Sequence, residues 1–137
     1  MTSKYSLALG LLMTVLSCMS PEKLLNDSSA ERLYFGKFGG FTNIPVDYVL
    51  INNEHVFKIE NDKYTYAVKI SKTQSGQIRN LLKEAGLPAL QLNEPGNMTY
   101  YIRMTSTTSE HEIKWTDQTQ NPKVWNLYKA LLSTLNQ

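Results

Sequence analysis

The chain has 137 residues, the size of one domain, of which 42% are hydrophobic and 19% are charged. This balance excludes a disordered chain, because disordered segments combine few hydrophobic residues with a high net charge. The formal net charge is +2 and no run of basic residues is longer than two, so the chain lacks the concentrated positive field that attracts nucleic acid. We therefore expect no nucleic-acid partner.

Residues 1–17 have the pattern of a secretory signal peptide. Residues 1–4 end in a positive charge, and the next twelve residues are uncharged and consist mostly of Leu, Ala, Met and Val. This apolar run is too short to cross a bilayer, which takes about 20 apolar residues. We therefore expect the leader to be removed on export.

The only cysteine, Cys18, follows this leader in the sequence VLSC. The stretch resembles the lipobox of bacterial lipoproteins, in which the thiol receives a diacylglyceryl group and cleavage leaves the cysteine as the first residue. A small residue, here Ser17, precedes the cut, and a thiol is the nucleophile that alkylation requires. The resemblance implies that Cys18 is lipidated, with palmitate-type chains that contribute about 0.8 kcal/mol per buried methylene. The alternative is an ordinary signal peptide with an incidental cysteine.

Residues 18–32 are polar apart from one Leu pair, which is typical of a flexible tether; a short helix from Glu22 is the alternative. Met19 stands where an aspartate signals retention at the inner membrane, so resemblance to Gram-negative sorting favours the outer membrane. We expect a lipid-anchored domain, residues 33–137, in the periplasm or at the cell surface.

Five β-type segments and two helices are predicted in this domain. Residues 33–38 open it, and residues 46–51 and 55–60 form a hairpin around two asparagines. Residues 64–70 continue the strand of residues 55–60 and are counted with it, with Tyr64, Tyr66, Val68 and Ile70 expected on one face. A helix follows, with Ser71 and Gln74 as a capping box and Gly86 as its end.

The second half repeats this order. Residues 98–105 alternate, with Tyr101 and Arg103 on the side opposite Ile102, and residues 111–116 read as the next strand. The last helix opens with Asn121 as its cap and Pro122 at its first position. We therefore expect an α+β fold, with an antiparallel sheet of four to five strands and two helices packed on one face, in a ββα-ββα layout.

Six residues form the candidate binding surface. The glycine-rich stretch FGKFGGF, residues 35–41, either packs its phenylalanines inward or forms an aromatic binding loop. The face of the sheet without helices carries tyrosine and arginine, the types enriched at interfaces. The candidates are Phe35, Phe38, Phe41, Tyr101, Arg103 and Trp125.

Catalytic, metal and cofactor sites are not expected. The two histidines, His55 and His111, lack the helical spacing of zinc ligands and stand at strand starts. The sequence contains no G-x-S-x-G motif, and the acids Glu94, Glu110, Glu112 and Asp117 are scattered. We expect no catalytic residue, no metal and no cofactor.

Several stretches carry a further resemblance: FGGFT at residues 38–42, YVLI at 48–51, NEPGNMTYYI at 93–102, HEIKW at 111–115 and NPKVWNLYKALL at 121–132. Together they resemble an uncharacterised family of small lipoproteins from Gram-negative bacteria with a strand-strand-helix repeat domain. The resemblance implies fold and location but no activity.

We expect a non-enzymatic module that binds an envelope protein or peptide. One alternative binds carbohydrate or another small ligand on aromatic platforms near Tyr101, Trp115 and Trp125. The weaker alternative is an envelope hydrolase or hydrolase inhibitor.

Overall fold

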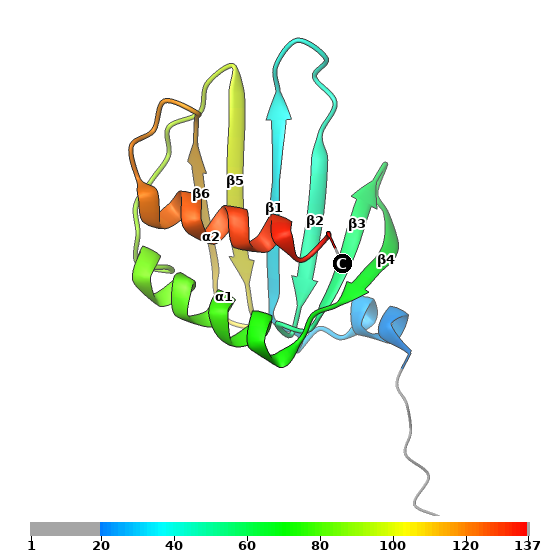
Figure 1. The fold of residues 1–137 in the computed structure, drawn as a ribbon. Helices are drawn as coiled ribbons and strands as arrows, with labels where there is room; N and C mark the ends of the chain where they lie inside the picture. Colours follow the sequence, from blue (N-terminus) through cyan, green and yellow to red (C-terminus); the bar gives the residue numbers. More distant parts are fainter. Residues whose placement is uncertain (1–19, 137) are drawn as a thin grey trace, which may run out of the picture.

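Six strands form one antiparallel sheet in the computed structural model, which describes residues 20–136 (Figure 1). The sheet order is β4-β3-β2-β1-β5-β6, so β1 is central and pairs with β2 on one side and β5 on the other. The elements in chain order are the 3-10 helix η1 (Pro21–Asn26), β1 (Arg32–Gly39), β2 (Val46–Ile51), β3 (His55–Glu60), β4 (Lys63–Lys69), α1 (Lys72–Ala85), β5 (Met98–Thr105), β6 (Glu110–Trp115) and α2 (Pro122–Ser133).

The α+β class predicted from the sequence is confirmed, but the strand count and the repeat layout are wrong. The sheet has six strands rather than four to five, and four strands rather than the expected three precede α1. The difference arises at Asn61 and Asp62, which both have positive φ, 49° and 61°. Such residues form the tight turns of two-residue hairpins, and β4 therefore folds back onto β3 as a separate strand.

The alternation expected along β4 is also interrupted. Tyr64 and Tyr66 pair with Ile59 and Phe57, whereas Val68 pairs with Val56, so Ala67 is an extra residue in the ladder. A β-bulge of this kind reverses the faces on which the following side chains lie. Consequently Val68 packs against the core under the helices, while Tyr66 packs against Phe57 on the other face.

The ends of both long helices follow the predicted capping residues. The Ser71 hydroxyl oxygen accepts from the Gln74 backbone N–H at 3.1 Å, and the Gln74 side chain accepts from the Ser71 N–H at 3.0 Å. Gly86 ends α1 in the left-handed conformation, with φ of 78°. The Asn121 side chain accepts from the Val124 N–H at 3.2 Å and caps α2. Both helices therefore begin where local hydrogen bonding predicts.

Both helices lie on the same face of the sheet (Figure 1). The alternation of side chains along the strands sends one set of apolar residues to this face, where they meet the apolar stripes of α1 and α2. The main core consists of Leu33, Phe35, Leu50, Val56, Ile70, Ile78, Ala85, Ile102, Ile113, Trp115, Val124, Leu127, Tyr128 and Leu131.

A smaller core lies on the opposite face, under η1. Leu24 of η1 and Ala30 pack against Val49, Ile51 and Phe57. The Arg32 guanidinium fixes the chain here by donating to the backbone oxygens of Leu24, Leu25 and Asp27 at 3.2, 3.1 and 2.9 Å. Part of the segment expected to be a tether is thus helical and packed on the sheet, and β1 begins at residue 32 rather than 33.

The predicted signal peptide, residues 1–17, and Cys18 lie outside the described residues. Within residues 20–136, no helix is both long enough and apolar enough to cross a membrane.

Candidate functional site

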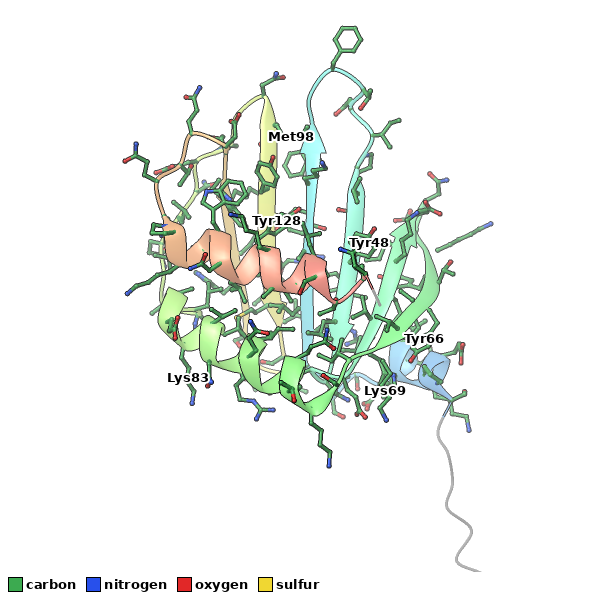
Figure 2. The ribbon with its side chains drawn as sticks, viewed as in Figure 1. Tyr48, Tyr66, Lys69, Lys83, Met98 and Tyr128 are labelled. Atoms are coloured by element: carbon green, nitrogen blue, oxygen red, sulfur yellow. The ribbon has the colours of Figure 1, made fainter. Side chains whose placement is uncertain are left out.

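Aromatic side chains gather on the face of the sheet opposite α1 and α2. The register places Tyr34 of β1 beside Arg103 of β5, and Phe38 and Tyr101 pack together with ring centroids 6.2 Å apart. Tyr64 and Tyr66 extend the same face on β4, where both are exposed; Figure 2 labels Tyr66. We call Tyr34, Phe38, Asp47, Tyr64, Tyr66, Tyr101 and Arg103 the aromatic face.

A hydrogen bond crosses the central strand of this face. The Tyr101 hydroxyl on β5 donates to the Asp47 carboxylate on β2 at 2.6 Å. The two side chains meet over Gly36, which pairs with both of them across the ladder. A Cβ at Gly36 would clash with the backbone oxygen of Val46 and lie 2.9 Å from the Asp47 carboxylate, so only glycine leaves room for this contact.

The Tyr101 phenol stays protonated far into the alkaline range. Burial, followed by the hydrogen bond to Asp47, raises the pKa of Tyr101 well above its usual value. Burial also raises the pKa of Tyr64, whose neighbour Tyr34 adds to the effect. Tyr101 and Tyr64 are therefore neutral phenols at physiological pH.

Arg103 lies on β5, beside Tyr34 of the neighbouring strand β1. Its guanidinium carbon lies 4.4 Å from the centroid of the Tyr34 ring, in a cation–π contact. Its Nε is buried and has no hydrogen-bond partner in the described part of the chain. Within residues 20–136 no carboxylate forms an ion pair with it: Glu112, opposite Arg103 on β6, pairs instead with Lys114 at 2.9 Å.

The six candidate residues from the sequence lie in three places: the aromatic face, the loop between β1 and β2, and the main core. Tyr101 and Arg103 lie on the aromatic face together with the exposed Phe38. Phe41 is fully exposed in the loop between β1 and β2. Phe35, in contrast, is fully buried in the main core, and Trp125 of α2 packs against that core.

Sequence reasoning did not assign Tyr34, Asp47, Tyr64 and Tyr66 to this face. The period-two pattern of Tyr64 and Tyr66 was visible in the sequence, but the bulge hid which face they take. Asp47 is 54 positions away from Tyr101, and no local pattern links them.

The tryptophans do not form an exposed platform. Trp115 is fully buried, and its ring is stacked on Tyr100 at 6.0 Å and meets Trp125 edge-on at 5.7 Å. Tyr128 of α2, labelled in Figure 2, completes this cluster. Trp125 donates its ring N–H to the Thr119 backbone oxygen at 3.1 Å. The sheet thus separates both tryptophans from Tyr101.

Three of the titratable groups considered for catalysis, His111, His55 and Glu94, have structural contacts. His111 contacts the Leu90 backbone oxygen through Nε2 at 2.7 Å, and His55 contacts the Tyr66 hydroxyl through Nδ1 at 3.2 Å. Glu94 accepts from the Thr119 hydroxyl at 2.8 Å. Among residues 20–136, no group of three or more His, Cys, Asp or Glu side chains is arranged to hold a metal ion.

A separate pocket of about 570 Å³ lies at the end of the sheet where β1 begins and β2 and β5 end, beside α1. This is the lower end of the sheet in Figure 1. Its lining includes no Phe, Tyr or Trp and no residue of the aromatic face. The volume falls within the range of about 300–1,000 Å³ that is usual for small-ligand sites.

No protein-family model matches the sequence, and a search of curated proteins finds no match.

Proposed function

We propose that the protein is a non-enzymatic lipoprotein of the Gram-negative envelope that binds a protein or peptide through its aromatic face. Acyl chains on Cys18 hold it in the outer membrane, with the domain in the periplasm or at the cell surface. The sequence VLSC behind an apolar leader supports the anchor, and the exposed residues of the aromatic face support the binding function.

The binding proposal rests on one observation: the Arg103 guanidinium is partly buried but forms no ion pair with a carboxylate of residues 20–136. It is held on the Tyr34 ring. A cation that has lost part of its hydration gains most from an incoming carboxylate or carbonyl oxygen. The partner therefore presents such an oxygen to Arg103 and apolar groups to the surrounding rings.

The other residues of the aromatic face also favour the binding of a protein or peptide. Tyrosine and arginine are the residues that contribute most at the centres of interfaces, because they bring large contact areas and hydrogen bonds at low entropic cost. The bond from Tyr101 to Asp47 holds the phenol ring in place before a partner arrives. A surface ordered in advance loses less conformational entropy on binding.

Photocrosslinking in intact cells tests the binding surface. Benzoylphenylalanine at position 38 lies on the aromatic face, and the same group at Lys129, an exposed residue of α2, serves as the matched control. We expect one reproducible envelope protein crosslinked from position 38 and not from position 129. Arg103→Gln should lower this yield by about fivefold or more, whereas Lys129→Gln should not. The same products from both positions would contradict the proposal.

Mass spectrometry of the native product tests the anchor separately. We expect a mature chain that begins at Cys18 and carries the mass of a diacylglyceryl group and further acyl chains. A chain that begins at another residue, or at Cys18 without acyl mass, would contradict lipidation. Cys18→Ala should release the protein from the membrane fraction.

A further inference from the structure

The pocket at the lower end of the sheet combines an apolar floor with charges of both signs. Leu33, Leu50 and Met104 come from three neighbouring strands, and Leu82 closes the floor from α1. Arg79 of α1 lies on one wall, whereas Glu31 and Glu110 lie beside the strand ends. The lining therefore combines an apolar floor with one cationic and two anionic side chains.

Three charged side chains of the pocket lining form no ion pair within residues 20–136. Arg79 is exposed and forms no ion pair with any carboxylate of residues 20–136. Glu31 and Glu110 are likewise exposed and have no cationic partner in that part of the chain. Arg32, which also lines the pocket, is occupied by three backbone oxygens.

Asn53, which also lines the pocket, is held in place by α1. Its side chain donates to the Ser75 backbone oxygen at 2.9 Å and to the Ser75 hydroxyl at 2.7 Å. The unpaired charges of the lining therefore suit an apolar ligand that carries both an anion and a cation.

We propose that this pocket binds a short apolar peptide with free termini, such as a di- or tripeptide. Its terminal carboxylate pairs with Arg79, its terminal ammonium pairs with Glu31 and Glu110, and its apolar side chains lie on the leucine and methionine floor. An extended tripeptide is about 10 Å long. This site is separate from the aromatic face and does not depend on lipidation.

Calorimetric titration of the full-length protein in lipid nanodiscs tests the proposal with the tripeptide Leu-Ala-Phe in three forms: free, N-acetylated and C-amidated. We expect saturable one-to-one binding of the free peptide, and affinities about fivefold weaker when either terminus is blocked. Arg79→Gln should abolish the effect of amidation, and the double change of Glu31→Gln with Glu110→Gln should abolish the effect of acetylation. Lys83→Gln, one turn further along α1 and outside the lining, is the matched control.

Methyl NMR locates the bound peptide independently. In protein labelled at the methionine methyl groups, the Met104 signal should shift on titration because Met104 lies in the floor. The Met98 signal should stay unchanged, since Met98 lies at the opposite end of β5 (Figure 2). Absence of saturable binding, equal affinities for the three peptide forms, or a shift confined to Met98 would overturn the proposal.

Discussion

Tyr101→Phe isolates the hydrogen bond that crosses the central strand. The change removes the hydroxyl that donates to Asp47 at 2.6 Å but keeps the ring that packs against Phe38. Hydrogen bonds to charged groups contribute about 1.5–3 kcal/mol. Because this bond is only part-buried, we expect the lower end of the range, a loss of about 1.5 kcal/mol in the free energy of unfolding.

Urea unfolding followed by tryptophan fluorescence measures this loss, since Trp115 and Trp125 lie in one packed aromatic cluster. With a slope of about 2 kcal/mol per molar urea, the midpoint should fall by about 0.7 M. A double-mutant cycle with Asp47→Ala should give a coupling energy of about 1 kcal/mol. Tyr66→Phe is the control, because its exposed contact with His55 is longer, at 3.2 Å, and should change stability by less than about 0.5 kcal/mol.

The reasoning would be refuted by either of two results. If Tyr101→Phe costs no more than Tyr66→Phe, the hydroxyl does not stabilise the folded state. If the effects of Tyr101→Phe and Asp47→Ala are additive, the two groups do not interact.

Three further outcomes are expected. Gly36→Ala should cost about 1–3 kcal/mol in urea unfolding, because its Cβ meets the Val46 backbone oxygen. Ser71→Ala should cost about 1 kcal/mol through loss of the cap, measured as a fall of about 4 °C in Tm. Burial raises the pKa of Tyr128 above its usual value of 10.0, so above pH 10 the unfolded phenol loses its proton before the folded one and contributes a fall in stability of up to about 1.4 kcal/mol per pH unit. Because Tyr101 contributes a fall of the same sign, Tyr128→Phe should reduce the total fall between pH 10 and pH 11 without abolishing it.

The helix ends were predictable because their signals are local. The hydroxyl of Ser71, the left-handed Gly86 and the side chain of Asn121 all act within four residues of the backbone they cap. The extra strand was not predicted because the strand-like pattern resumes at residue 64, directly after Asn61 and Asp62, where it was expected to continue the strand of residues 55–60 rather than to turn back. One extra residue at the β4 bulge then reversed the expected face of Val68.

The aromatic face was predictable only where it follows alternation along a single strand. Tyr101 and Arg103 lie two residues apart on β5, so period two places them together. The contact with Asp47 depends on how β2 and β5 each pair with β1, which no short sequence pattern specifies. The sequence also left open whether Phe35 packs inward or belongs to an aromatic binding loop. The structure places its ring in the main core.

The position of η1 determines which end of the sheet would lie near a membrane. Ser20 precedes η1, which lies at the lower end of the sheet in Figure 1, and only one residue separates Ser20 from Cys18. Two residues span at most about 7 Å, whereas the eight residues of β1 extend about 26 Å. A lipid on Cys18 would therefore keep the lower end of the sheet, and with it the proposed peptide pocket, close to the headgroups.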